Sequence, residues 1–301
     1  MTHISATLDW FSQAKYGLFV HFLPSGEGYQ DIIDTFDVEQ FAADCAKAGA
    51  AYLVWTLGQN SGYFCAPSAS YDTFAGRSAG DTCSTRDLPG DLIGALGKYN
   101  IKLMLYAPGD PPAFDKEAAK GLGATEFVHN FNGENWGFND TMVERWGSVI
   151  AEWSERYGDR ISGWWLDGCY RESGFTDDHA AVLARSVKHG NSGSIVAFNT
   201  GINFDKVSDS EDYLAGETVD LLTGVCEARF KEGAQWHELS FLGEQWGSAP
   251  PRYTAAQISQ HLMQNILPNG GVLTLDIPID GSRIESHTMR LLAEVRSVIR
   301  K

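Results

Sequence analysis

The stretch that decides how this chain is interpreted is residues 161–168, ISGWWLDG. It is a short apolar segment that ends on a carboxylate and is followed by glycine, which predicts a buried parallel strand with Asp167 exposed where the strand opens into a loop. In α/β barrels the carboxyl ends of the strands carry the chemistry. Indole faces pack well on sugar rings, so an acid beside two tryptophans favours a carbohydrate site. The alternative is an ordinary strand-end aspartate that caps the next turn.

The rest of the chain alternates short apolar segments with longer amphipathic ones, the pattern of βα units. Strands are predicted at 17–22, 51–56, 102–106, 161–167, 194–199, 236–242 and 272–277, with one more within 204–235. Helices are predicted at 38–49, within 87–99, and at 141–157, 178–189, 255–266 and 287–299. This alternation predicts an α/β fold, a (β/α)8-like TIM barrel forming a single domain over residues 1–301, irregular near strands five and six. The stretch 107–140 is too long for an ordinary connection and is predicted to be a substrate-side loop.

Composition narrows the classes of partner. The chain has 301 residues and a formal net charge of −16, from 39 acidic residues against 23 lysines and arginines. Such a field repels phosphate backbones, so we expect no nucleic-acid partner. No apolar stretch approaches the ~20 residues needed to span a bilayer, so we expect no membrane partner. The first five residues show no basic segment followed by an apolar core, from which we expect no signal peptide and a cytoplasmic location.

Metal and thiol chemistry have little support. The five cysteines include no Cys-x-x-Cys pair, so reduced thiols are expected. The eight histidines show neither His-x-x-x-His nor His-x-x-Glu-His spacing. A metal hydrolase built on His21, Asp167 and Glu217 is therefore a minor alternative, and we expect neither a metal nor another cofactor.

Cleavage of a glycosidic bond needs two carboxyl groups, one that protonates the leaving oxygen and one that attacks the anomeric carbon or activates water. Asp167 is the better candidate for the nucleophile. Spacing alone does not choose its partner among the acids that follow, which are Glu211, Asp212, Glu217, Glu227, Glu238 and Glu244.

Five segments of the chain occur in the order found in one enzyme family. They are 14–21 (AKYGLFVH), 36–52, 86–88 followed by 103–106, 165–168 (WLDG), and 246–247 followed by 269–281. In this order and at these spacings they resemble the glycoside hydrolase family 29 α-L-fucosidases over roughly residues 10–300. The resemblance implies a retaining hydrolase that releases a terminal α-linked sugar, an α-L-fucoside or a related glycoside, from a small carbohydrate substrate.

The resemblance also implies roles for individual residues. Asp167 aligns with the nucleophile, and 212–217 (DYLAGE) is similar to a family segment whose Glu is the acid/base in one branch, which selects Glu217. His21 aligns with a ligand of the sugar hydroxyls. The predicted substrate-binding set is His21, Trp55, Gln59, Asn60, Tyr106, Trp165, Asn199 and Trp246.

Three departures from the family pattern affect specificity and assembly. Residues 59–64 (QNSGYF) replace two adjacent histidines followed by an acid, and 198–200 (FNT) lacks the arginine of the family's fifth strand. Amides still bind sugar hydroxyls, but in a different hydrogen-bond pattern, and an unpaired buried polar group costs ~1–3 kcal/mol. The family's C-terminal β-sandwich does not follow the last helix, so we expect a homo-oligomer that covers the exposed barrel surface.

These departures keep a second hypothesis open. The same barrel could be a sugar-binding protein that is catalytically inactive, because the altered amide pair and the missing arginine lie where the family binds its sugar. The retained Asp-Gly strand end argues against it, since a pure binder has no evident need for that acid.

Overall fold

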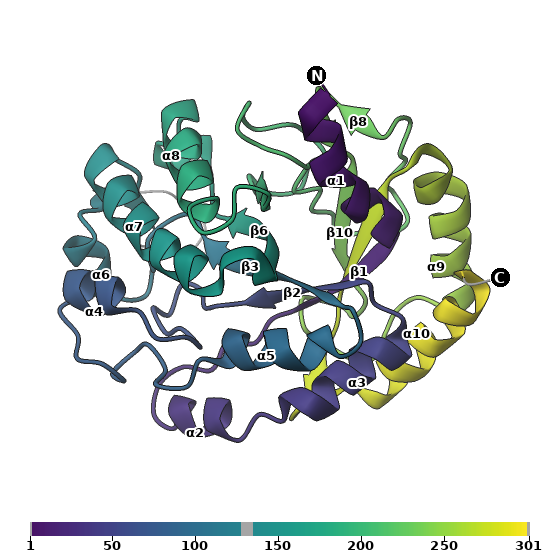
Figure 1. Cartoon of the computed structure of the whole chain (residues 1–301), viewed down its shortest axis with the longest axis horizontal. Coiled ribbons are helices and arrows are strands. Elements are labelled where there is room, and N and C mark those ends of the chain that lie inside the picture. Colours follow the sequence, from purple (N-terminus) through teal and green to yellow (C-terminus); the bar gives the residue numbers. More distant parts are fainter. Residues whose placement is uncertain (1, 128–134, 300–301) are drawn as a thin grey trace.

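The computed structural model describes residues 2–127 and 135–299 and is built on one curled parallel sheet (Figure 1). The sheet has seven strands in the order β10-β11-β1-β2-β3-β6-β7. Their bounds are β1 Tyr16–Val20, β2 Tyr52–Thr56, β3 Lys102–Pro108, β6 Ile161–Asp167, β7 Ile195–Phe198, β10 His237–Phe241 and β11 Val272–Asp276. Every pairing in it is parallel, so the carboxyl ends of all seven strands meet at one edge.

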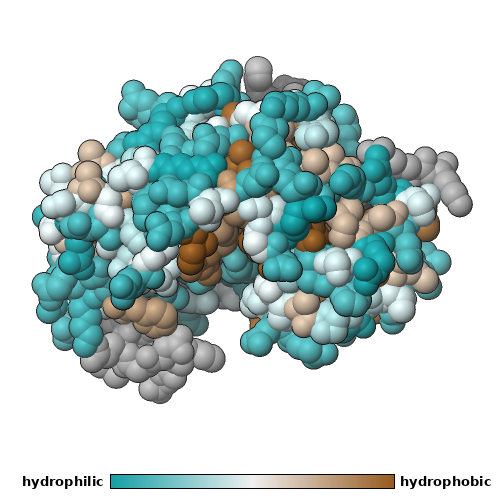
Figure 2. All heavy atoms as spheres, turned by 90° about the horizontal axis from the view of Figure 1, so that it is seen from below, coloured by the Kyte–Doolittle hydropathy of each residue, from teal (hydrophilic) through white to brown (hydrophobic). Residues whose placement is uncertain are grey.

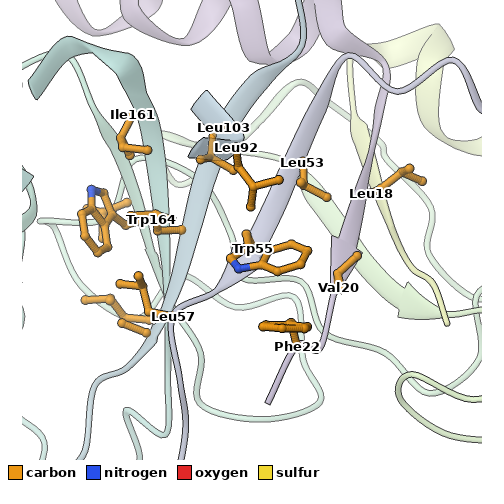
Figure 3. Close-up of a cluster of buried hydrophobic side chains, with 14 of the residues drawn as sticks. Leu18, Val20, Phe22, Leu53, Trp55, Leu57, Leu92, Leu103, Ile161 and Trp164 are labelled. Carbon is orange, nitrogen blue, oxygen red and sulfur yellow. The ribbon is translucent and has the colours of Figure 1, made fainter. Parts of the chain in front are cut away.

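Side chains alternate between the two faces of the sheet, as the two-residue period of a strand requires. In β2, Leu53 and Trp55 belong to the large hydrophobic core, whereas Tyr52 and Val54 belong to a second, smaller core. Figure 3 shows part of the large core, where residues of β1, β2, β3 and β6 pack beneath a helix. The small core fills the concave side of the sheet. The alternation of side chains along each strand therefore decides which residues reach this side and the site.

Helices cover the convex side of the sheet (Figure 1). Six of the helices are α3 Val38–Ala48, α5 Leu88–Gly97, α7 Asp140–Tyr157, α8 Asp177–Val187, α9 Ala255–His261 and α10 Ser286–Ile299. Helix α3 packs against both α5 and α10, and α7 packs against α8. All six lie where the sequence predicts helices, because each carries an apolar face at helical spacing and most begin at a side-chain cap such as Asp37 or Asn139.

The amino-terminal end of the concave core is closed by a helix that the sequence pattern did not predict. Helix α1, Thr2–Ala14, places the fully buried Phe11 against Tyr52, Tyr213 and His237, with ring centroids 4.9–5.5 Å apart. Shorter unpredicted helices are α2 Tyr29–Asp34, α4 Ala69–Ala75 and α6 Lys116–Gly121. Helix α1 thus fills the amino-terminal end of the concave core, opposite the carboxyl edge of the strands.

The strand predicted within 204–235 does not form as a regular element, so the closed (β/α)8 barrel is not what the described residues show. That region contains only the two-residue strands β8 Phe230–Lys231 and β9 Ala234–Gln235, which pair with each other. The segment 212–218 nevertheless runs between β7 and β10. It makes isolated parallel bridges from Tyr213 to Gln235 and from Glu217 to Leu239, and the Asp212 amide donates to the Val196 carbonyl. The predicted irregularity near strands five and six lies at this place.

The predicted substrate-side loop 107–140 holds α6 and a short hairpin of β4 Thr125–Phe127 and β5 Asn135–Gly137, and its part 128–134 lies outside the described residues.

Among the described helices, none is long and apolar enough to cross a bilayer. The face shown in Figure 2 is mostly hydrophilic, with hydrophobic residues in small scattered patches. This surface agrees with the strongly acidic composition.

Candidate active site

A small pocket opens at the carboxyl ends of the strands, on the concave side of the sheet. It encloses about 320 Å³ of empty space, counting the part that is open to solvent. Its walls come from β1, β3, β6 and β10, from the connections after β1, β2 and β10, and from the irregular segment 212–218. The lining residues are Phe19, His21, Gln59, Tyr106, Trp165, Asp167, Glu217, Leu239 and Trp246.

Asp167 ends β6 and accepts hydrogen bonds at both carboxylate oxygens. Oδ2 accepts from the Tyr106 hydroxyl at 2.7 Å, and Oδ1 accepts from Asn199 Nδ2 at 2.7 Å and from the Gly168 amide at 2.9 Å. Gly168 has φ 71°, a left-handed conformation that costs glycine little, and this turn brings its amide back to the carboxylate. These three donors fix the orientation of the Asp167 carboxylate at the end of β6.

Glu217 lies across the pocket from Asp167, and one amide group joins the two acids. Asn199 Nδ2 is 2.7 Å from an Asp167 oxygen and 2.5 Å from Glu217 Oε2. Those two carboxylate oxygens can therefore be no farther apart than the sum of these distances. Asn199 is almost fully buried at the end of β7, so its position is fixed by the core.

The environment of Glu217 favours the protonated acid. Burial and the nearby charge of Asp167 raise the pKa of Glu217 to about 7, against the opposing effects of the Asn199 hydrogen bond and of His21. Asp167, held by three donors, thus faces a carboxyl group whose pKa is raised to about 7. A buried acid with a raised pKa beside a second acid is an arrangement that general acid catalysis uses.

His21 is held by an acid that the sequence interpretation missed. Its Nδ1 lies 2.8 Å from Asp276 Oδ1, and Asp276 Oδ2 accepts from the Gly247 amide at 2.6 Å. A carboxylate accepts only, so Nδ1 carries the hydrogen and Nε2 is left for a ligand. Asp276 ends β11 as Asp167 ends β6, and that shared position at a strand end was the available signal.

Aromatic rings form the walls around the two acids. Tyr106 and Trp165 are neighbours in the β3–β6 register and stack with ring centroids 5.6 Å apart. Trp246 lies 5.4 Å from the His21 ring, and Phe19 lies between His21 and Trp165. Such faces suit the C–H faces of a sugar ring, whose hydroxyls would meet His21 and the acids.

Gln59 and Tyr106 extend the hydrogen-bond chain from Asp167. Gln59 Nε2 donates to the Tyr106 hydroxyl at 2.7 Å, and this hydroxyl donates to Asp167. Burial and the Asp167 charge raise the pKa of Tyr106 well above its usual value, so the hydroxyl keeps its proton. Tyr106 therefore stabilises the negative charge of Asp167.

The variant Tyr106→Phe tests this hydrogen bond. A bond to a charged group contributes about 1.5–3 kcal/mol, so we expect kcat/KM to fall about 10- to 100-fold. The matched control is Tyr157→Phe, which removes a 2.8 Å bond from a tyrosine hydroxyl to Asp87, far from the pocket. The control should lower the melting temperature but keep the parent kcat/KM. Parent activity in Tyr106→Phe would show that Asp167 does not need this donor.

Three predicted binding residues differ from the others in where they lie. Asn199 donates to both acids but is not among the lining residues. Asn60 is not a lining residue either, and its backbone carbonyl accepts a hydrogen bond from the Phe114 amide. The prediction for Trp55 is wrong. Its ring packs on Phe22 in the convex core (Figure 3), because it shares the strand parity of Leu53 rather than that of Val54.

The other acids that the sequence left open as partners of Asp167 are engaged elsewhere. The carboxylate of Glu211 accepts from the amides of Val207 and Phe198, and Asp212 pairs with Lys188 at 2.7 Å. Glu238 is buried against His261, with 2.9 Å between Oε2 and Nε2. Glu227 and Glu244 are exposed.

The described residues form neither a metal-binding site nor a disulfide. Among the described residues, no group of three or more histidine, cysteine or acidic side chains could hold a metal ion. The five cysteines are free and buried. The pocket's own groups are carboxyl, imidazole, amide and phenol, which are the groups of acid–base and nucleophilic chemistry.

Two acids joined by one amide group and set among aromatic rings, at the carboxyl edge of a curled parallel sheet, form an arrangement that glycosidases use. The sequence matches the family described as alpha-L-fucosidase over residues 22–295. The chain belongs to the alpha-L-fucosidase family. No curated protein sequence matches it.

Solved structures share the fold at low sequence identity. An endo-fucoidan hydrolase of glycoside hydrolase family 107, MfFcnA4, has a TM-score of 0.73 at 13% identity, covering 98% of this chain and 54% of its own. Alpha-L-fucosidase AlfC, in complex with Fuca(1,6)GlcNAc, has a TM-score of 0.68 at 17% identity over 98% of each chain. Alpha-L-fucosidase isoenzyme 1 from Paenibacillus thiaminolyticus has a TM-score of 0.70 at 18% identity, covering 99% of this chain and 76% of its own. This chain thus spans about half the length of the fucoidan hydrolase.

Proposed function

We propose that this protein hydrolyses terminal α-linked L-fucosides, or closely related glycosides, with retention of anomeric configuration, as a family 29 enzyme would. The observation that carries the proposal is that one amide group, Asn199 Nδ2, contacts both Asp167 and Glu217. This contact limits the separation of one pair of carboxylate oxygens to the sum of the two distances, which supports the ~5–5.5 Å geometry of retaining enzymes over the ~6.5–9.5 Å geometry of inverting ones.

In the first step, Asp167 attacks the anomeric carbon while Glu217 gives its proton to the departing glycosidic oxygen. The bond to the leaving group breaks as the bond from an Asp167 oxygen forms, and the leaving alcohol departs neutral. The Tyr106 hydroxyl and Asn199 hold the Asp167 carboxylate in position during the attack. The stacked rings of Tyr106 and Trp165 exclude water from one side of the sugar.

In the second step, the ionised Glu217 takes a proton from water, and the resulting hydroxide attacks the anomeric carbon. Asp167 leaves as a carboxylate, and the sugar is released with its original configuration. Asn199 contacts both acids, so it can hold whichever of them is charged at each stage. We assign the binding of the sugar hydroxyls to His21 Nε2 and Gln59, because both residues line the pocket.

A screen of nitrophenyl glycosides tests the proposal. The panel contains the α-L-fucoside, the α-L-galactoside, the α-L-rhamnoside and the β-D-galactoside. Hydrolysis of the α-L-fucoside or the α-L-galactoside, with the retained anomer seen by NMR at early times, is the expected result. An inverted first product would overturn the mechanism, and no turnover of any α-L-glycoside would overturn the activity.

The pKa of Glu217 predicts a pH dependence. Because the pKa is raised from 4.5 to about 7, Glu217 in the free enzyme is protonated below that pH and ionised above it. We expect kcat/KM for a fucoside with a poor leaving group to decrease as the pH rises through about 7. A kcat/KM profile that stays flat to about pH 9 in the parent protein would contradict the assignment of Glu217 as the acid.

A second candidate function is sugar binding without catalysis. It is favoured by Gln59, which stands where the family has a histidine and whose amide is engaged with Tyr106. Binding of L-fucose seen by calorimetry, with no hydrolysis of any panel member over days, would support it. The cytoplasmic location and the homo-oligomer stay predictions, and sedimentation of the purified protein tests the latter.

A further inference from the structure

The segment that carries Glu217 lacks the regular ladder of the other strands. Two backbone hydrogen bonds tie it to β10, from the Thr218 amide to the Leu239 carbonyl and from the Leu239 amide to the Gly216 carbonyl. Its start is tied by backbone hydrogen bonds between Asp212 and Val196 and between Gln235 and residues 212 and 214, so the ladder is interrupted at the turn 214–216. A catalytic acid on an irregular segment needs other groups to hold it, because a misplacement of 1 Å can cost about 100-fold in rate.

A buried histidine contacts this segment directly. His237 Nδ1 lies 3.0 Å from the Leu214 carbonyl oxygen and 3.1 Å from that of Ala215, and the side chain is 2% exposed. Carbonyl oxygens accept only, so Nδ1 must carry the hydrogen that both contacts share. His237 thus donates to the two residues that begin the turn into Gly216 and Glu217.

The other ring nitrogen is held by a chain of hydroxyls that fixes this tautomer. With the hydrogen on Nδ1, Nε2 accepts, and Thr274 Oγ1 at 2.6 Å is its donor. Thr274 then accepts from the Tyr52 hydroxyl at 2.5 Å, the shorter of the two contacts of that hydroxyl. Burial lowers the pKa of His237 to about 4, so the ring stays neutral where the enzyme would work.

The same segment is also tied to the strand of the nucleophile. Trp165 Nε1 donates to the Ala215 carbonyl at 3.2 Å, and the Tyr213 hydroxyl donates to the Trp164 carbonyl at 2.9 Å. Gly216 has φ 63°, and a Cβ there would lie 1.9 Å from the His237 carbonyl oxygen, so this close approach to β10 requires glycine. The Ala215 carbonyl therefore lies between the ring of His237 and the strand that ends on Asp167.

We propose that His237 is a positioning residue for acid catalysis: its single neutral tautomer, fixed by Thr274 and Tyr52, bridges the gap in the backbone ladder at 214–216 and holds Glu217 at the leaving oxygen. This inference rests on the proposed function. His237 is not among the residues that line the pocket, so its effect on Glu217 would pass through the backbone of 214–216.

Two amide variants of His237 test the roles of its two ring nitrogens separately. In His237→Asn the amide nitrogen is as many bonds from Cα as Nδ1 is, so it can donate to the 214 and 215 carbonyls. In His237→Gln the amide nitrogen corresponds to Nε2 and reaches toward Thr274 instead. The Gln variant should misplace Glu217, and the Asn variant should hold it.

The readout is the ratio of kcat/KM on two fucosides that differ in leaving group. An α-L-fucosyl disaccharide needs its leaving oxygen protonated, whereas the 2,4-dinitrophenyl fucoside does not. We expect His237→Gln to lose about 10- to 100-fold on the disaccharide and less than about threefold on the dinitrophenyl glycoside. His237→Asn should recover most of the disaccharide activity.

A second variant and a control keep the test decisive if the Gln variant does not fold. Thr274→Val removes the hydroxyl donor to Nε2 but leaves Tyr52 its other acceptor, the Leu273 carbonyl, and should shift the ratio in the same direction by about 3- to 10-fold. Ser154→Ala removes a buried hydroxyl bond to the Val187 carbonyl between α7 and α8, and should change both rates equally.

The possible outcomes distinguish this inference from the function on which it rests. Glu217→Ala is the benchmark for a lost acid. If Glu217→Ala is selective for leaving group but neither His237→Gln nor Thr274→Val is, the inference is wrong and the acid assignment stands. Parallel losses on both substrates in the folded Gln variant would likewise reduce His237 to a structural role. If Glu217→Ala is itself unselective, the proposed mechanism fails first.

Discussion

The variant Asp167→Gly is expected to lose hydrolysis of every α-L-fucoside, with kcat lower by about 10⁴-fold or more, the size of effect seen when a nucleophile is removed. Azide should restore turnover, because the missing side chain leaves room for a small anion beneath the anomeric carbon. The rescued product should be the fucosyl azide of inverted configuration, since azide attacks once from the side that Asp167 occupies. NMR of the product gives the configuration.

The control for this variant is Asp209→Gly, which removes an exposed carboxylate paired only with Lys206 among the described contacts. It should keep parent activity. Thermal melting of Asp167→Gly should show a folded protein, because the acid is one half-buried side chain at a strand end. Full hydrolytic activity in Asp167→Gly would remove Asp167 from the mechanism, and rescue that gives a retained product would place the nucleophile elsewhere.

The variant Glu217→Ala is expected to lose about 10²- to 10⁴-fold on glycosides with poor leaving groups, the usual contribution of a general acid. On the 2,4-dinitrophenyl fucoside, the first step should stay close to parent. The second step then limits the rate, since no base activates water, so a burst of dinitrophenol should precede slow turnover. Stopped-flow absorbance measures the burst and the steady rate separately.

Glu244→Ala is the matched control, because the sequence left this acid open as a partner of Asp167 and the structure leaves it exposed. It should show parent rates on both substrates. Equal losses of Glu217→Ala on poor and activated leaving groups, with no burst, would contradict the role of Glu217 as acid and base.

The sequence could predict which site residue ends a strand, but not which alternate residues of a strand face the pocket. Asp167 was found because an apolar segment ending in Asp-Gly marks a strand end by itself. Trp55 was misplaced because a fully buried strand, apolar on both faces, gives no sign of which alternate residues face the pocket. Only the register with β1 and β3 sets that parity, through pairs such as Val20 with Trp55 and Thr56 with Tyr106.

The partner of Asp167 shows the same limit. From the residues alone, six acids between 211 and 244 were open, and the resemblance to the family selected Glu217. What distinguishes Glu217 physically is its shared contact with Asn199 and its burial beside a second charge. The shared contact depends on Asn199, 18 positions away in the chain, and the second charge belongs to Asp167, 50 positions away. The sequence around Glu217 does not show that these residues lie close in space.

The sequence by itself determined the alternation of strands and helices, the acidic surface and the acid at the end of β6, because hydrophobic periodicity and turn residues act locally. The tertiary structure alone decided that 212–218 takes the place of an eighth strand with an interrupted ladder and that α1 closes the core. It also decided that Asp276 contacts His21 and that His237 contacts the segment of Glu217. These features depend on hydrogen bonds and contacts between segments far apart in the chain, and they exist only once the sheet has curled and brought its two edges toward the same segment.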